Sequence, residues 1–224
     1  MRFHVLRPLL ALALVSGLAL PAVSAQAPPD WVALVGDYPH AGSEGQIGDT
    51  AVLLWLQRTR TRAEVARAAG EVIPRPALFS EVLGVDLESS RFPLTRALLE
   101  AAARDLHGVV GELKGHFARP RPYNEDPRIK PSVSLERSYA YPSGHAAWGA
   151  MEAAVLADLV PKLQDAILER GRQVGNDRVL AGVHHPSDVE AGQKLGAALA
   201  AIWLKDPARR GQLDAARAAE WTGF

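Results

Sequence analysis

The chain is 224 residues long, carries 25 Lys and Arg against 25 Asp and Glu, and contains no cysteine. That length suits one domain with a sizeable core, and a content of 48% hydrophobic and 22% charged residues excludes a disordered or low-complexity chain. Zero net charge gives no general attraction to nucleic acid or acidic membranes, and the lack of cysteine excludes disulfides, cysteine nucleophiles and thiolate metal sites.

The first 25 residues have the layout of a secretory signal peptide. Arg2 and Arg7 precede an apolar run over 9–20, and small residues follow at 23–25, where a signal peptidase would cut. The run is too short to span a bilayer comfortably, although an uncleaved anchor helix is the alternative. Two later apolar stretches contain or adjoin charged residues and are better explained as buried helices. We therefore predict export to the periplasm without stable membrane insertion.

The remaining chain predicts helices and few strands. Residues 26–50 are rich in Gly, Pro and Asp and predict an irregular lead-in. Residues 51–224 predict a single all-α domain, a compact helical bundle, because apolar residues recur there at helical spacing. In chain order, we predict helices over residues 51–60, 62–71, 93–117, 148–159, 161–174, 186–204 and 207–220, with a turn-rich surface loop over 123–141.

The first cluster of candidate functional residues contains two cations. Lys114 lies in the last turn of the predicted helix over 93–117, and Arg121 follows in an Arg-Pro-Arg-Pro run that ends the helix. Cations favour helix C-termini, and such a run can be solvated surface. Two cations held by different backbone types could also clamp a phosphate, with Arg as a bidentate fork and Lys as a point charge.

The second cluster is Pro142-Ser143-Gly144-His145, directly before a helical pattern. Ser143 is a good N-cap, Gly144 lets the backbone approach a ligand closely, and the unpaired N–H groups of a helix start favour an anion. His145 projects from the first turn. The residues alone leave open a capped helix with an incidental histidine or an anion site.

The third cluster is Arg178, His184 and Asp188, with a helix predicted to begin at Pro186. Asp188 in the first turn is well placed to cap N–H groups. It could instead accept a hydrogen bond from one imidazole nitrogen of His184, which would fix the tautomer. The other nitrogen would then be available as a nucleophile toward an anion held at that helix start.

Together the clusters resemble the three-part signature of the phosphatidic acid phosphatase and vanadium haloperoxidase superfamily, in order and in internal spacing. Within it, a small exported chain is similar to the class A bacterial non-specific acid phosphatases, over roughly residues 42–204. One position departs from the family pattern: Asp177 stands where a Ser usually precedes the Arg of the third motif. The added carboxylate could pair with Arg178 and weaken its hold on phosphate, or point to solvent.

The resemblance implies an acid phosphatase that hydrolyses small phosphate monoesters with broad specificity through a phosphohistidine. His184 would attack phosphorus, Asp188 would orient His184, and His145 would protonate the leaving alcohol and later deprotonate water. No metal or cofactor is implied, and vanadate inhibition and a homo-oligomer are expected. The residues implied in phosphate binding are Lys114, Arg121, Ser143, Gly144 and Arg178.

Three other functions use the same residues. A vanadate-dependent haloperoxidase would bind vanadate in the same pocket, but such enzymes tend to be considerably larger. A lipid phosphatase normally has several membrane spans, although a soluble enzyme could take lipid or isoprenoid phosphates presented in solution. An inactive phosphate-binding module would bind phosphate without turnover. The motifs do not identify the preferred ester.

Other side chains near the motifs receive weaker predictions. We expect a packing or surface role for His107, a surface role for Arg119, and a place in the pocket wall for His185, which adjoins the candidate nucleophile. Tyr123 and Tyr141 are expected at the pocket mouth. We expect two segments to determine substrate specificity: the loop over 123–141 and the lead-in over 26–50.

Overall fold

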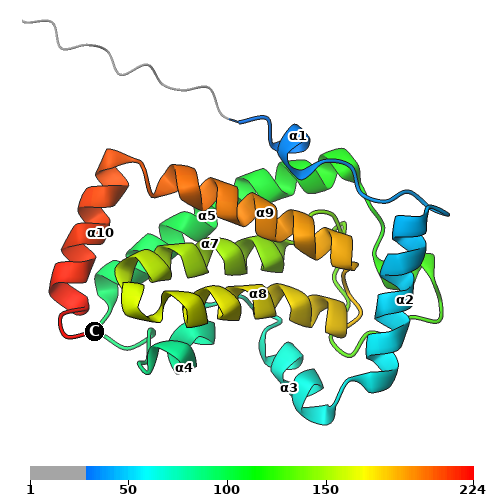
Figure 1. Cartoon of the computed structure of the whole chain (residues 1–224), viewed down its shortest axis with the longest axis horizontal. Coiled ribbons are helices and arrows are strands. Elements are labelled where there is room, and N and C mark those ends of the chain that lie inside the picture. The colour runs from blue at the N-terminus through cyan, green and yellow to red at the C-terminus, as the bar shows by residue number, and fades with distance from the viewer. Residues whose placement is uncertain (1–28) are drawn as a thin grey trace, which may run out of the picture.

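A computed structural model describes residues 29–224, and over that range it consists of helices and loops without a strand (Figure 1). The all-α prediction is confirmed. The predicted signal peptide, residues 1–25, lies outside the described residues. The longer helices are α2 Glu44–Thr59, α3 Arg62–Gly70, α5 Pro93–Phe117, α7 Gly144–Leu159, α8 Gln164–Leu180, α9 Pro186–Trp203 and α10 Pro207–Glu220. The short helices are α1 Trp31–Val35, η1 Pro76–Phe79, α4 Ser80–Leu83, α6 Pro122–Glu125 and η2 Pro161–Leu163.

Helix α7 forms the centre of the bundle. It is apolar around most of its circumference, and it packs between α8 and α9 with α5 on a further side (Figure 1). Glycines allow the closest crossing, since a Cβ added to Gly149 would lie 2.5 Å from the carbonyl oxygen of Gly171 on α8. No helix between residues 29 and 224 combines the length and the apolar character needed to cross a bilayer.

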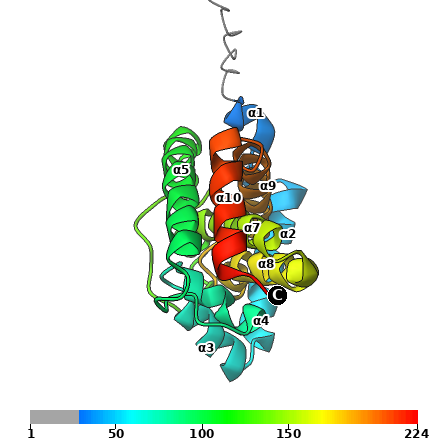
Figure 2. The same cartoon turned by 90° about the vertical axis from the view of Figure 1, so that its left-hand side faces the viewer.

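Helix α10 covers one end of the bundle, and its last residue anchors the start of α5 (Figure 2). The Glu220 carboxylate accepts hydrogen bonds from the backbone N–H groups of Leu94 and Thr95 at 2.6 and 2.9 Å. It thereby satisfies amide groups that a helix leaves unpaired in its first turn. This remote cap fixes the start of the long helix whose other end reaches the candidate site.

The prediction of an irregular lead-in over 26–50 is wrong in part. Helix α1 lies within that range, and α2 begins at Glu44 rather than at residue 51. The hydroxyl of Ser43 caps α2 by accepting a hydrogen bond from the Gln46 N–H at 3.2 Å. Glycines in the first turns lower the helix propensity of this segment, so the local sequence does not predict the start of the helix. In the folded chain, packing offsets that low propensity.

Buried polar side chains gather at one end of the bundle. Helices α7 and α9 begin there and α8 ends there, on the right-hand side of Figure 1. The Ser143 N–H donates to the Asp188 carbonyl at 2.8 Å, which ties the two helix starts together. A side chain at Gly192 would collide with the Ser143 carbonyl, so glycine permits this approach. The buried polar residues of this region include Arg119, Arg121, Arg178, His184, His185 and Asp188.

Candidate active site

The three sequence clusters meet at this end of the bundle, although they come from five segments of the chain. If Gly144 carried a Cβ, it would lie 4.0 Å from the Lys114 Cε atom, so the first cluster borders the second. Lys114 belongs to the end of α5, Arg121 to the following segment, Ser143, Gly144 and His145 to the start of α7, Arg178 to the end of α8, and His184 and Asp188 to the start of α9.

The His184 side chain is buried and held by two neighbours. Its Nδ1 lies 3.2 Å from Asp188 Oδ2, and its Nε2 lies 2.9 Å from Arg121 Nη1. Because a guanidinium can only donate, Nε2 accepts, and the proton of the neutral imidazole is on Nδ1, which donates to Asp188. Burial, followed by the charges of Arg121 and Lys114, lowers the pKa of His184 well below its usual range. The imidazole is therefore neutral, with the lone pair on Nε2.

Asp188 combines the two roles that the sequence leaves as alternatives. Its Oδ2 accepts from the His185 N–H at 2.8 Å as well as from His184, so it caps α9 and orients the imidazole. Its Oδ1 accepts from Arg119 Nη1 at 2.6 Å. The carboxylate has no solvent exposure. Three donors therefore fix its position.

The prediction of a surface role for Arg119 is wrong. Its side chain is 1% exposed, and Nη2 lies 3.3 Å from Asp49 Oδ2 while Nη1 binds Asp188. The guanidinium also lies over the Tyr38 ring, 4.9 Å from its centroid. Its partner Asp49 is far away in the sequence, so a local pattern gives no sign of this buried bridge behind His184.

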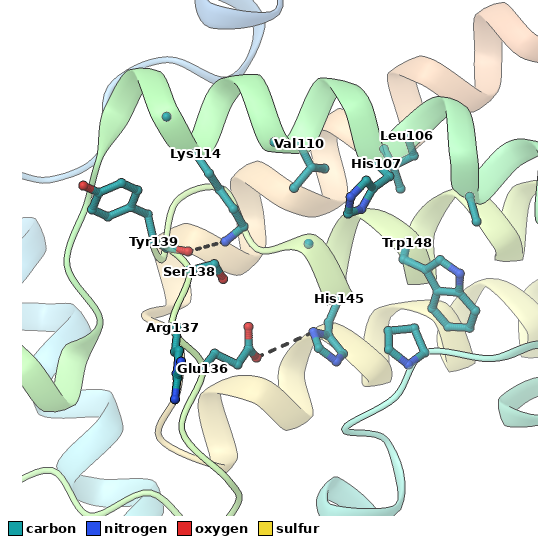
Figure 3. A pocket seen from close by; sticks show the side chains of 15 residues that line it. Leu106, His107, Val110, Lys114, Glu136, Arg137, Ser138, Tyr139, His145 and Trp148 are labelled. Carbon is teal, nitrogen blue, oxygen red and sulfur yellow. Dashed lines mark hydrogen bonds and ion pairs between the residues drawn. The ribbon is translucent and has the colours of Figure 1, made fainter.

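The start of α7 presents a capped helix with a buried histidine. The Ser143 hydroxyl accepts from the Ala146 N–H at 3.3 Å, as expected of an N-cap. His145 Nε2 lies 3.1 Å from the Val72 carbonyl oxygen, which can only accept, so Nε2 carries a hydrogen. His145 Nδ1 faces Glu136 Oε1 at 3.9 Å (Figure 3). Nδ1 is thus the atom at which His145 gains or loses its proton.

The surroundings of His145 shift its pKa in both directions. Burial, and then the charge of Arg178, lowers the pKa of His145 below its usual range. The Glu136 carboxylate and the hydrogen bond to the Val72 carbonyl act against this shift, while Arg121 adds to it. The cations that would bind phosphate therefore make His145 harder to protonate, and Glu136 offsets part of their effect.

Lys114 points from α5 toward the loop that precedes α7. Its ammonium donates to the carbonyl of Tyr139, and to that of Ala140 at 3.3 Å. Burial, together with the charge of Arg121, lowers the pKa of Lys114 to about 8. Lys114 is therefore protonated at acid and neutral pH, and it is bound to backbone carbonyls that an incoming anion could replace.

Arg178 is also buried, and it has spare hydrogen-bonding capacity. Its Nη2 donates to the Ala68 carbonyl and lies 3.7 Å from Glu71 Oε2. Its Nε has no hydrogen-bond partner in the part of the chain that the structure describes. A buried N–H without a partner is costly, so this donor is suited to a ligand oxygen.

Asp177 follows neither of the two alternatives predicted for it. Its carboxylate oxygens accept from Arg67 Nε and Nη2 of α3 at 2.7 and 2.8 Å, and the residue is 2% exposed. It therefore neither pairs with Arg178 nor points to solvent. The family's usual Ser is replaced here by an acidic residue that holds α3 against α8, outside the motif.

The structure adds Glu136 to the site, a residue that sequence reasoning missed. Its Oε2 accepts from Arg121 Nη2 at 2.5 Å, while its Oε1 faces His145. Burial opposes ionisation, but the charge of Arg121 lowers the pKa of Glu136 below its usual range. A carboxylate thus lies among the groups predicted to bind phosphate. Its position in a turn-rich loop offered no motif that could have identified it.

A pocket of about 830 Å³ opens between α5, the start of α7 and residues 136–139 (Figure 3). Lys114, Glu136 and His145 lie along its polar side. His107, for which we expected a packing or surface role, also lines it. Between residues 29 and 224, no group of three or more His, Asp or Glu side chains is arranged to hold a metal ion.

The predictions that Tyr123 and Tyr141 lie at the pocket mouth and His185 in the pocket wall are wrong, because none of the three lines this pocket. Tyr141 is buried, and its hydroxyl donates to the carbonyls of Val35 and Gly36, both at 2.9 Å. Tyr123 donates to the Glu136 carbonyl at 2.8 Å and supports the loop from behind. His185 is buried and lies 2.7 Å from a Glu125 carboxylate oxygen. The tyrosine that does line the pocket is Tyr139.

Comparisons with known proteins find one matching family and several relatives. The family model described as the PAP2 superfamily matches residues 95–212. A non-specific acid phosphatase of Providencia stuartii is 30% identical over 200 residues, which cover 84% of this chain and 79% of the relative. A non-specific acid phosphatase of Salmonella typhimurium is 31% identical over 145 residues, which cover 62% of this chain and only 57% of that relative. A transmembrane PAP2 type phosphatidylglycerolphosphate phosphatase from Bacillus subtilis gives a TM-score of 0.42 at 24% identity, covering 70% of this chain and 92% of the other.

Proposed function

The chain belongs to the PAP2 superfamily, and from that premise we propose that it is an exported acid phosphatase that hydrolyses phosphate monoesters through a phosphohistidine. It is a phosphoric monoester hydrolase of broad specificity, similar to the class A enzymes. The observation that carries the proposal is the state of His184. Its Nδ1–H is bound to Asp188, which leaves the lone pair of Nε2 for attack on phosphorus.

Substrate binding replaces contacts that the site makes with itself. Arg121 Nη2 is bound to Glu136, and Lys114 is bound to backbone carbonyls of the same loop. A phosphate dianion offers both cations stronger acceptors, and the unpartnered Nε of Arg178 can bind a third oxygen. The Ser143 hydroxyl and the Gly144 N–H at the start of α7 complete the phosphate site.

Hydrolysis then proceeds in two balanced steps. In the first, His184 Nε2 forms a bond to phosphorus as the bond from phosphorus to the ester oxygen breaks, and His145 Nδ1 gives its proton to the departing alkoxide. In the second, His145 takes a proton from water, whose oxygen attacks phosphorus and breaks the P–N bond. Asp188 stabilises the imidazolium of the phosphorylated His184. Three side-chain cations offset the phosphoryl charge, so the scheme requires no metal.

The environment of His145 supports an acid pH optimum. The first step needs His145 protonated, and burial with the charge of Arg178 lowers its pKa. Activity should therefore fall as pH rises through that lowered pKa. The pKa of His184 is lowered well below its usual range, so His184 stays neutral over the pH range in which the enzyme works.

The direct test is His184→Ala, with His116→Ala on the exposed face of α5 as the matched control. We expect His184→Ala to lower kcat at least about a thousandfold with a phosphate monoester, while its thermal unfolding stays cooperative. Rapid quenching of the wild-type enzyme with labelled substrate should trap an acid-labile phosphohistidine. Full activity of His184→Ala would sink the assignment. EDTA should have no effect, and vanadate should inhibit.

Export, cleavage of residues 1–25, a periplasmic location and a homo-oligomeric state belong to the same proposal. N-terminal sequencing of protein from a periplasmic extract should give a chain beginning at Gln26. A chain that retains Met1 contradicts cleavage. Light scattering of the purified protein measures the oligomeric state, and a monomer at all concentrations contradicts the expected homo-oligomer.

A further inference from the structure

The pocket has two unlike halves. Figure 3 shows Lys114 and Glu136 toward the left, Leu106 and Trp148 toward the right, and His145 between them. The polar half includes three of the residues assigned to phosphate binding and proton transfer, Lys114, Gly144 and His145. The other half is lined by Pro74, Ala103, Leu106, His107, Val110 and Trp148.

The apolar half follows one face of α5. Ala103, Leu106, Val110 and Lys114 recur at helical spacing, so they form a single stripe that ends at the phosphate site. At roughly 1.5 Å of rise per residue, the stripe extends about 16 Å from Lys114 to Ala103. Gly111 lies on the same face, and a Cβ added there would meet no atom within 4 Å. The absence of a side chain at Gly111 leaves this part of the pocket open.

The position of His145 determines what this half can bind. His145 gives its proton to the ester oxygen, so the alcohol extends from the phosphate past His145. Along α5, the surface that it meets is formed by Val110, Leu106 and, across the pocket, Trp148. The pocket volume of about 830 Å³ lies in the range of sites that enclose a whole small ligand, so it has room for far more than a phosphate.

We propose that, within a broad range of phosphate monoesters, the enzyme prefers those of apolar alcohols, with a group the size of one aromatic ring or a short alkyl chain, over those of sugars. This inference rests on the proposed function and specifies its substrate class. Burial of a ring or chain against the α5 stripe stabilises binding. A sugar in the same place would find a polar side chain only at His107 among the residues that line this half, so most of its hydroxyl groups would lack partners.

The first experiment compares four esters of primary alcohols, whose leaving groups have similar intrinsic reactivity. These are ethyl, 2-phenylethyl, n-hexyl and glucose 6-phosphate. We expect kcat/KM for 2-phenylethyl or n-hexyl phosphate to exceed that for glucose 6-phosphate by about ten- to a hundredfold. The ratio between 2-phenylethyl and n-hexyl phosphate tells whether the pocket favours a ring or a chain.

The second experiment fills the pocket. Gly111→Leu places a side chain on the apolar face, and it should lower the preference for 2-phenylethyl over ethyl phosphate by about tenfold. The matched control is Gly108→Leu on the same helix, where a Cβ also meets no atom within 4 Å but which does not line the pocket. Gly108→Leu should leave all four values unchanged. Should Gly111→Leu fold poorly, Val110→Thr adds a hydroxyl at constant size and should lower the same preference severalfold.

The outcomes separate this inference from the proposed function. Equal kcat/KM values for 2-phenylethyl, n-hexyl and glucose 6-phosphate would overturn the apolar preference while leaving the phosphatase proposal intact. An unchanged preference in both Gly111→Leu and Val110→Thr would also overturn it. Release of phosphate from none of the four esters would overturn both proposals. Selective loss of the large apolar esters in Gly111→Leu supports the assignment.

Discussion

Glu136→Gln separates the two effects that this carboxylate has on the site. The substitution keeps the size and shape of the side chain and removes its charge. Arg121 Nη2, which donates to the charged Glu136 Oε2 at 2.5 Å, would then have at most a neutral amide oxygen as its acceptor there. His145 would lose the negative charge that faces its Nδ1. We expect tighter binding of phosphate, because it no longer competes with a carboxylate for Arg121. We also expect a shift of the pH profile to the acid side.

The size of the first effect follows from burial. A hydrogen bond to a charged group is worth about 1.5–3 kcal/mol when solvent is excluded. The Arg121 side chain is 2% exposed but that of Glu136 is 30% exposed, so screening reduces the contribution to about 1 kcal/mol. Phosphate displaces this contact when it binds. Its inhibition constant should therefore fall about fivefold in Glu136→Gln.

The pH effect has a definite sign. The Glu136 charge raises the pKa of His145 against burial, Arg178 and Arg121, which lower it. Removing that charge lowers the pKa of His145 further. Since the first step of the proposed mechanism needs protonated His145, the alkaline limb of kcat/KM should move to lower pH.

The assay measures inhibition by inorganic phosphate at fixed pH, and kcat/KM as a function of pH. The matched control is Glu169→Gln, which removes a carboxylate from an exposed pair with Arg172 on α8. We expect it to change neither quantity. If phosphate binds Glu136→Gln no more tightly than wild type and the alkaline limb stays in place, Glu136 is neither a competitor for Arg121 nor a partner of His145.

Three further predictions concern other charged groups, one in the candidate site and two outside it. Inorganic phosphate should inhibit less strongly above about pH 8, because the pKa of Lys114 is about 8 and its charge is lost there; inhibition constants for Lys114→Arg should lack this loss. Glu152 is 1% exposed, lacks a hydrogen-bond partner between residues 29 and 224, and has its pKa raised well above 4.5 by burial. Its contribution to stability is fully present below about pH 4.5 and is lost as pH rises through the raised value, so Glu152→Met should raise the free energy of unfolding at neutral pH by about 1–3 kcal/mol in urea titrations. Arg67→Ala leaves the buried Asp177 carboxylate unpaired and should lower that free energy by about 2 kcal/mol, whereas Asp177→Ser should lower it by less than about 1 kcal/mol. Equal losses in these two variants would contradict the account of Asp177.

The helices were predictable wherever one face is apolar and a proline marks the boundary. The predicted bounds 93–117 and 207–220 agree with α5 and α10, each of which begins with proline. The patterns do not predict the short helices over 76–83, and they start α2 too late. These segments take their helical form from contacts with the bundle, which a window of local sequence does not contain.

The difference between local patterns and distant contacts also explains which site residues could be predicted from the sequence. Residues fixed by their place at a helix start, such as Ser143 and Asp188, could be identified because capping is a local interaction. Arg119 was misjudged because the carboxylates that bury it, Asp49 and Asp188, lie about seventy residues away on either side. No spacing rule connects an arginine after a helix end with partners so distant in the chain.

Asp188 and Glu136 show why burial, rather than residue type, distinguishes two carboxylates beside two histidines. Asp188 is unexposed and bound by three donors, so it can orient His184 but cannot move aside. Glu136 is 30% exposed and comes from a loop, so it can leave Arg121 when an anion arrives. His184 itself is 1% exposed, and its Nε2 becomes accessible only if the contact with Arg121 changes. Displacement of Glu136 by an anion would free Arg121 Nη2, while Nε and Nη1 stay bound to the carbonyls of Ser138 and Val183. Glu136 is therefore the group beside Arg121 that can give way to an anion, which makes it the first residue to alter.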